Sequence, residues 1–365
     1  MQTPATVLDH HAPFPVLLAP MVGLTHFVVR RAIQEYLPSG QRSLWPTEML
    51  NSRRIPSQCI GASIETRFDD FEQGLCPQLL GNEEGPIRDS IAKLRDWGAR
   101  AIDINMGCSV KRALTHNYGV ALMGDPDYAA EVTAMAVKYA GDLPVSVKIR
   151  AAPPPDEIHK NHRLPFTEQN QEFLKNFCLK IQEAGASWIT IHPRTAAQRR
   201  KGRADWSQIA SLKQWLKIPV IGNGDIQTIE DVERMFKETG CDRVMIGRAL
   251  LAKPWLLGSF SREQFEDGRM PVSPVNDTVR AGAEYGKFLS RVLDLSREHY
   301  VESLGVRRFR YLAHFGCPYL EYGHNFYASL TSVGTYDGLN KRITEFFGVR
   351  FDRPQNMVSH TSLRY

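Results

Sequence analysis

The sequence predicts an α/β protein, a closed (β/α)8 TIM barrel followed by a C-terminal helical domain. Between residues 14 and 257, short apolar runs alternate with helix-like segments eight times. Eight such units in series favour a closed barrel over an open, doubly wound sheet. From residue 275 to about 347 this rhythm stops and apolar residues recur at helical spacing instead.

The expected strands are short apolar runs, as in parallel sheets that are buried on both faces. They cover residues 14–21, 44–49, 76–81, 101–105, 144–150, 187–192, 218–225 and 242–248. Amphipathic helices are expected at 25–37, 84–97 and 127–139, where apolar residues recur every three or four positions.

The length of 365 residues suits a barrel of roughly 250 residues plus one smaller unit. We expect a catalytic barrel over 1–267, a linker rich in Gly, Pro and Ser over 268–274, a helical domain over 275–350 and a tail over 351–365. Hydrophobic residues make up 42% of the chain, which is ordinary for a globular protein.

Composition and cysteine spacing argue against membrane, secreted and zinc-binding proteins. No stretch approaches the roughly 18 apolar residues of a membrane span, and the N-terminus lacks the features of a secretion signal. The six cysteines are widely spaced, without a CxxC pair or zinc-ligand spacing. We therefore expect a cytoplasmic protein with no membrane and no metal. The net charge of +5 permits an anionic partner without requiring one.

Polar residues stand where the expected strands end, and a barrel brings these ends together at one mouth. The strand-end residues are Met21, Glu48, Gln78, Asn105, Lys148, His192, Asn223 and Arg248. A single strand-end Asn or His often satisfies nearby backbone groups. Seven polar groups at one mouth indicate a binding or catalytic site.

Cys108 follows the fourth expected strand, after Gly107. A free cysteine is usually an inert core residue. Its position just beyond a strand end, where barrels place their chemistry, favours a catalytic role. Glycines at 222, 224 and 247 offer bare backbone N–H groups after the last two strands, where barrels commonly bind a phosphate. No GxGxxG motif follows a strand, so a Rossmann domain is not supported.

Seven motifs, in order and at matching spacing, strongly resemble the flavin-dependent tRNA-dihydrouridine synthase family. They are Ala19-Pro20-Met21, Gln78-Leu79-Leu80-Gly81, Asn105-Met106-Gly107-Cys108 with Lys111, Lys148-Ile149-Arg150, His192-Pro193-Arg194-Thr195, Asn223-Gly224-Asp225 and Met245-Ile246-Gly247-Arg248. The resemblance covers residues 14–257, and the helical tail is similar, less specifically, to that family's RNA-binding domain.

The resemblance implies an enzyme that binds FMN in the barrel mouth and uses NADPH to reduce the C5=C6 bond of specific uridines in tRNA. The implied cofactor-binding residues are Pro20, Met21, Gln78, Lys148, His192, Asn223, Gly224, Asp225, Gly247 and Arg248. Cys108 would be the catalytic acid, and the implied substrate-binding residues are Asn105, Lys111, Arg150 and Arg194.

The implied chemistry suits these residue types. Hydride from the flavin reaches C6 of the uracil and leaves an enolate-like charge, so C5 needs a proton. A thiol with a pKa near ~8.5 is protonated at neutral pH and still acidic enough to donate. The chain departs from the family where Ser109 replaces the usual proline and where Pro153-Pro154-Pro155 opens a long loop. Both departures bear on how the substrate is placed.

An RNA substrate requires cations around the mouth. Basic clusters occur at 53–54, 111–112, 159–163, 199–203 and 307–310. Tyr311, Tyr319 and Tyr322 could stack on bases, although at this spacing they are more often core residues. Two alternatives stay open: an FMN-dependent barrel oxidoreductase acting on a small molecule, of the dihydroorotate or enoate type, and a catalytically inactive RNA-binding barrel.

Overall fold

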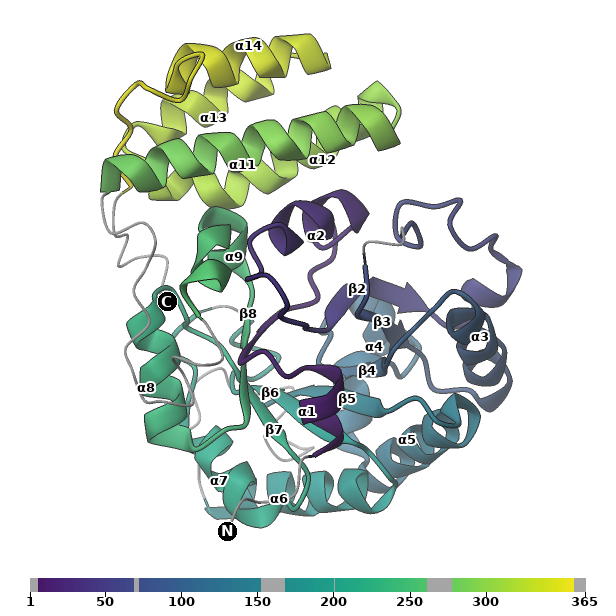
Figure 1. The fold of residues 1–365 in the computed structure, drawn as a ribbon. Helices are drawn as coiled ribbons and strands as arrows, with labels where there is room; N and C mark the ends of the chain where they lie inside the picture. The colour runs from purple at the N-terminus through teal and green to yellow at the C-terminus, as the bar shows by residue number, and fades with distance from the viewer. Residues whose placement is uncertain (1–5, 69–71, 152–167, 200, 261–277, 358–365) are drawn as a thin grey trace.

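The computed structural model describes residues 6–68, 72–151, 168–199, 201–260 and 278–357 (Figure 1). The linker expected at 268–274, Pro153-Pro154-Pro155 and the basic cluster at 159–163 lie outside the described residues.

Eight parallel strands form one curled sheet in the order β1-β8-β7-β6-β5-β4-β3-β2. They are β1 (Val16–Leu18), β2 (Trp45–Asn51), β3 (Leu75–Leu80), β4 (Ile102–Met106), β5 (Val145–Arg150), β6 (Trp188–His192), β7 (Val220–Asn223) and β8 (Arg243–Ile246). The first and last strands of this order are brought together by two hydrogen bonds. Phe14 N donates to Arg42 O at 3.2 Å, and Ser43 Oγ donates to Val16 O at 3.3 Å. The predicted barrel is confirmed.

Helices surround the sheet (Figure 1). They are α2 (Phe27–Gln34), α3 (Glu84–Asp96), α4 (Lys111–Thr115), α5 (Pro126–Ala140), α6 (Glu168–Glu183), α7 (Ser207–Trp215), α8 (Ile229–Thr239) and α9 (Arg248–Ala252). Short 3-10 turns cover Ile55–Ser57, Gly119–Gly124 and Pro254–Ser259. The strand side chains pack against the apolar faces of these helices in one continuous core, which fixes the strand ends that carry the site.

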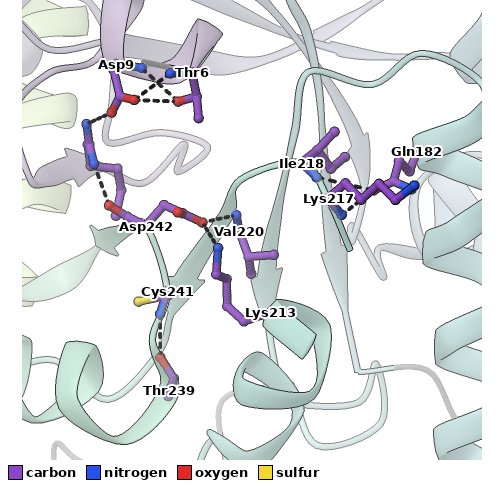
Figure 2. Close-up of polar contacts among 11 residues, drawn as sticks. Thr6, Asp9, Gln182, Lys213, Lys217, Ile218, Val220, Thr239, Cys241 and Asp242 are labelled. Atoms are coloured by element: carbon purple, nitrogen blue, oxygen red, sulfur yellow. Dashed lines mark hydrogen bonds and ion pairs between the residues drawn. The ribbon is translucent and has the colours of Figure 1, made fainter. Parts of the chain in front are cut away.

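A short helix that the sequence analysis did not predict, α1 (Val7–His11), lies at the amino end of the barrel. Asp9 accepts hydrogen bonds from Thr6 N at 2.7 Å and from Arg243 Nη2 at 2.6 Å, which ties α1 to the start of β8. Asp242 accepts from Lys213 Nζ and Val220 N, both at 2.7 Å (Figure 2). This network lies at the end of the strands opposite the catalytic mouth, so its role is stability.

The C-terminal helical domain contains α11 (Thr278–His299), α12 (Glu302–Gly316), α13 (Gly323–Thr331) and α14 (Tyr336–Phe347), with a 3-10 turn at Cys317–Tyr319. It rests on the barrel through α11 against α2 and α12 against α9 (Figure 1). Residues 351–357 pack back onto it, since Glu321 N donates to Asn356 O at 2.8 Å. The placement brings α12 to the barrel mouth.

Candidate active site

A cavity of about 930 Å³ opens at the carboxyl ends of the strands. Fourteen of the fifteen site residues expected from the sequence line it: Pro20, Met21, Gln78, Asn105, Cys108, Lys148, Arg150, His192, Arg194, Asn223, Gly224, Asp225, Gly247 and Arg248. Lys111 is the first residue of α4, but its side chain lies outside the described part of the structure. These fourteen residues therefore lie together at the strand ends, and their individual roles stay predictions.

A chain of hydrogen bonds runs from the barrel interior to the backbone of Cys108. Gln78 Nε2 donates to Asp103 at 2.7 Å, and Asn105 Nδ2 donates to Gln78 Oε1 at 2.7 Å. Asn105 Oδ1 accepts from the backbone N–H of Gly107 at 3.1 Å and of Cys108 at 2.8 Å. The Asp103 carboxylate can only accept, so Gln78 must turn its amide nitrogen toward it. The backbone N–H groups of Gly107 and Cys108 can only donate, so Asn105 must turn its amide oxygen toward them. Asn105 thus holds the cysteine loop.

Three further contacts fix the Cys108 loop. Arg150 Nε donates to Gly107 O at 2.7 Å, and Val120 N donates to Cys108 O at 2.9 Å. Gly119 has φ of +59°, and a Cβ there would lie 2.5 Å from Cys108 O, so this position needs glycine. Cys108 itself is half-buried and lines the cavity, which suits a thiol that must meet a substrate.

Lys148 extends from the end of β5 into the cavity, where its Nζ donates to Asn223 Oδ1 at 3.3 Å. Asn223 Nδ2 in turn donates to Met245 O at 2.7 Å. Burial and the nearby charge of Arg150 lower the pKa of Lys148 to about 8, against the opposing effect of Asp103. Lys148 is therefore a cation at neutral pH that can lose its proton in mild alkali.

His192 is uncharged at neutral pH. Burial lowers its pKa well below the usual value, and the cations Lys148, Arg150, Arg194 and Arg248 lower it further. Arg194 Nη1 lies 3.1 Å from His192 Nε2, and since an arginine can only donate, Nε2 accepts. The ring proton is then on Nδ1, which can donate a hydrogen bond to a ligand.

Arg194 does not present its guanidinium to the open cavity. Its side chain is 1% exposed, forms an ion pair with Asp225, and donates to Gly202 O from Nε at 3.1 Å and from Nη2 at 2.6 Å. Asp225 Oδ2 also accepts from Ala204 N at 2.6 Å. Although both residues border the cavity, these bonds give them a part in holding the loops after β6 and β7.

Glycines bring the backbone close to the cavity after the last two strands. Gly224 has φ of +120°, and a Cβ there would lie 2.8 Å from Ala204 Cβ and 3.0 Å from His192 Cδ2. At Gly247 a Cβ would lie 3.3 Å from Met21 Sδ. A side chain at 224 would therefore displace its neighbours, whereas glycine leaves the backbone N–H groups accessible to a ligand.

Glu48 departs from the expectation that it faces the mouth. It is buried and accepts hydrogen bonds from Gly23 N and, at 3.3 Å, from Arg308 Nη1 of α12. Burial raises the pKa of Glu48 above its usual value, although the charge of Arg308 acts in the opposite direction. β2 continues to Asn51, so Glu48 lies inside the strand instead of at its end, at an irregularity in the β2–β3 ladder between Pro46 and Met49. Arg308, expected among the RNA-facing cations, instead joins the two domains.

Sequence reasoning missed Asp103 and left Tyr311 undecided. Asp103 stands two residues before Asn105 on β4, so period-two alternation places both side chains on one face of the strand and could have revealed it. Burial raises the pKa of Asp103 to about 6, although hydrogen bonds from Gln78 and Ser146 act against this. Tyr311 is 41% exposed and lines the cavity from α12. Only the packing of the two domains reveals its position.

Two of the expected RNA-facing cations, Arg199 and Lys201, line the cavity and are exposed. Arg53 is exposed but pairs with Glu83 at 2.5 Å. Among the described residues, no group of three or more His, Cys, Asp or Glu side chains is arranged to hold a metal ion. Within the same residues, no helix combines the length and the apolar character that a membrane span requires.

The fold and the polar, cation-rich cavity at the strand ends define a barrel enzyme. Comparison with known proteins makes the class specific, because residues 17–285 match the family model "Dihydrouridine synthase". The chain is 31% identical over 297 residues to a probable tRNA-dihydrouridine synthase of Rhodobacter capsulatus, covering 80% of this chain and 83% of that protein. A probable tRNA-dihydrouridine synthase 1 of Synechocystis is 33% identical over 273 residues, covering 70% of this chain and 71% of the other.

This chain belongs to the dihydrouridine synthase family. The resemblance and the enzyme class expected from the seven motifs are confirmed. Among solved structures, 2-naphthoyl-CoA reductase aligns with a TM-score of 0.48 and 11% identity, over 70% of this chain and 50% of that chain. So low a similarity adds nothing to the family assignment.

Proposed function

We propose that this enzyme reduces the C5=C6 bond of specific uridines in tRNA to 5,6-dihydrouridine, with FMN as cofactor and NADPH as reductant. The observation that carries the proposal is that Cys108 shares one cavity with Lys148, His192 and the glycines at 224 and 247, in a chain of this family. The reductant rests on the family resemblance alone.

The cavity fits a flavin mononucleotide in size and in the chemistry of its donors. Its volume of about 930 Å³ lies in the range of small-molecule and cofactor sites. Pro20 and Met21 offer an apolar wall, while Gln78, Lys148 and the His192 ring nitrogen would meet the polar edge and side chain of the flavin. Asn223, Gly224, Gly247 and Arg248 would hold its phosphate, and Asp225 would support them by anchoring Arg194. When bound, the flavin would supply the hydride for C6 of the uracil.

Cys108 would supply the proton that C5 needs. The loop around Cys108 is fixed by Asn105, Arg150 and Val120, so the thiol has a defined position at the cavity wall. The neighbouring charges of Lys148 and Arg150 favour negative charge on the uracil carbonyl during the reaction. Positioning and charge together lower the barrier to protonation at carbon.

The cations around the mouth favour RNA over a small substrate. Arg199 and Lys201 are exposed and line the cavity, where a small neutral substrate would have no need of them. The assignments of Lys111, Arg150 and Arg194 to the substrate remain part of this proposal. Arg194 would affect the substrate indirectly, through the loop that it anchors.

The test uses purified enzyme, NADPH and an unmodified tRNA transcript, with dihydrouridine measured by mass spectrometry. Wild type should form dihydrouridine. Cys108→Ala and Cys108→Ser should bind FMN and accept electrons from NADPH at the wild-type rate, yet form product at least about 100-fold more slowly, because neither side chain is an effective acid at neutral pH. Wild-type turnover by Cys108→Ala would exclude the thiol as the proton donor.

A further inference from the structure

Exposed apolar side chains surround the mouth of the cavity. Val22 in the β1–α2 loop is 61% exposed, Val110 before α4 is 53% exposed and Tyr311 on α12 is 41% exposed, and all three line the cavity. Large hydrophobic residues are normally exposed singly, whereas three of them exposed around one cavity indicate a binding surface. Within the described residues, Tyr311 is also the one contribution of the helical domain to the cavity wall.

The Tyr311 ring is held in place without a ligand. A Cβ on Gly23 would lie 2.7 Å from Tyr311 Cε1, so the ring edge rests directly on the glycine backbone. Phe315 packs against the ring edge to face, with the centroids 5.3 Å apart. One turn earlier on α12, Arg308 is anchored to Glu48. A ring that is already fixed loses little conformational entropy when a ligand binds to it.

Cations accompany this apolar rim. Arg199 and Lys201 line the same cavity and are exposed. The Arg199 carbonyl accepts from Arg150 Nη1 at 3.1 Å, which connects the segment to the substrate end of the site. An exposed aromatic ring and exposed cations on the wall of one cavity are the combination that binds unpaired nucleotides, because the ring stacks on a base and the cations meet phosphates.

We propose that Val22, Val110 and Tyr311 form a second base-binding site, in which the nucleobase next to the target uridine leaves its stack and lies on the Tyr311 ring. Arg199 and Lys201 meet the adjoining phosphates. The inference rests on the proposed function, because it requires the target uridine to enter the cavity below. Stacking on Tyr311 replaces part of the stacking that the RNA loses when the uridine is extracted.

The experiment uses the flavin-loaded, full-length enzyme and an RNA that carries the fluorescent base 2-aminopurine beside the target uridine. Binding to wild type should change the fluorescence, and Tyr311→Phe, which keeps the ring, should do the same. Tyr311→Ala and Tyr311→Leu should lose the change and raise the Kd for RNA about tenfold. Leucine fills the space against Gly23 and Phe315, so it tests the aromatic face separately from the packing. Tyr322→Ala is the control, since Tyr322 is 62% exposed in the same domain and does not line the cavity.

Flavin absorbance and the melting temperature report whether each variant is folded and loaded. Unchanged RNA affinity in both Tyr311→Ala and Tyr311→Leu would overturn the proposal. A raised KM for NADPH with unchanged Kd for RNA would also overturn it, since the ring would then hold the adenine of the reductant. If wild type itself formed no dihydrouridine in tRNA, the failure would lie with the proposed function.

Discussion

At the scale of single residues, two cations, Arg194 and Lys148, contribute to the site in different ways. Arg194 is almost fully enclosed and distributes its guanidinium over Asp225, Gly202 and His192. Lys148 faces the cavity and keeps its charge at a cost, because burial and Arg150 oppose it. The first cation organises loops, and the second offers charge to a ligand.

Arg194→Lys should destabilise the protein by about 2–4 kcal/mol, because the compact lysine ammonium cannot reach all the acceptors that the guanidinium fork spans and leaves Asp225 poorly compensated. Flavin affinity should fall as well, since His192 loses the bond that sets its tautomer. The matched control is Arg199→Lys, at an exposed position on the cavity rim. Urea unfolding compares the two, and equal stability would show that the Arg194 fork has no structural role.

Lys148 makes the stability of the flavin-free protein depend on pH. Its pKa is about 8 when folded, against an ordinary value of 10.5. Below pH 8 both the folded and the unfolded chain carry the proton, so the folded state bears the full cost of the buried charge. Above pH 10.5 neither carries it and the cost is gone. Lys148→Met should therefore be more stable than wild type below pH 8, with a difference that shrinks between pH 8 and 10.5.

Urea midpoints across this pH range measure the effect, with Lys217→Met as an exposed control. A constant difference between wild type and Lys148→Met would contradict the lowered pKa of Lys148.

At the scale of elements, the strand ends and the loops after them determine the site. The apolar rhythm predicted all eight strands, usually within two or three residues, because strands buried on both faces leave a plain signal. Seven of the eight strand-end residues that it singled out line one cavity. It misplaced Glu48, because β2 continues to Asn51 and leaves this residue inside the strand, and it missed α1, which has only five residues.

Sequence could not show which polar groups bind one another. Asn105 and Arg194 were expected to contact substrate, and the structure engages both with the protein's own backbone and side chains. Tyr311 reached the cavity only through the packing of α12 on the barrel. Such contacts between distant parts of the chain leave no local periodicity.

Gly224→Ala should weaken FMN binding at least about tenfold, because its Cβ would push on His192 and Ala204 at a loop that approaches the phosphate. Gly240→Ala is the control: it also has positive φ, but a Cβ there meets nothing within 4 Å, so only backbone strain of about 1 kcal/mol is added. Fluorescence titration of FMN measures both variants. Equal affinities would show that the close approach at Gly224 does not serve the cofactor.

At the scale of the whole molecule, the helical domain is joined to the barrel by polar as well as apolar contacts. Besides Arg308–Glu48, Tyr300 Oη lies 3.1 Å from His26 Nδ1, and Arg291 Nη2 pairs with Glu35 at 2.8 Å. The last two of these contacts lie on α2 and on the loop before it, which also carries Met21. The helical domain is therefore fixed to the segment that brings Met21 to the cavity.

Arg308→Met should destabilise the protein by about 2–4 kcal/mol, because it leaves the buried Glu48 carboxyl without its cation. Removing both charges in the double variant Glu48→Gln/Arg308→Met should restore part of that loss. Arg307→Met, at the adjacent exposed position, is the control. Thermal unfolding of these three variants and of the single variant Glu48→Gln tests the pair, and a double variant less stable than either single one would contradict the coupling.

The proposed activity, formation of dihydrouridine in tRNA, can be tested in cells. The most direct measurement is the dihydrouridine content, by mass spectrometry, of total tRNA from cells that lack the gene and from the same cells carrying wild type or Cys108→Ala. We expect the modification to disappear at a specific position without the gene, to return with wild type and to stay absent with Cys108→Ala. Unchanged dihydrouridine in the tRNA of cells without the gene would contradict it.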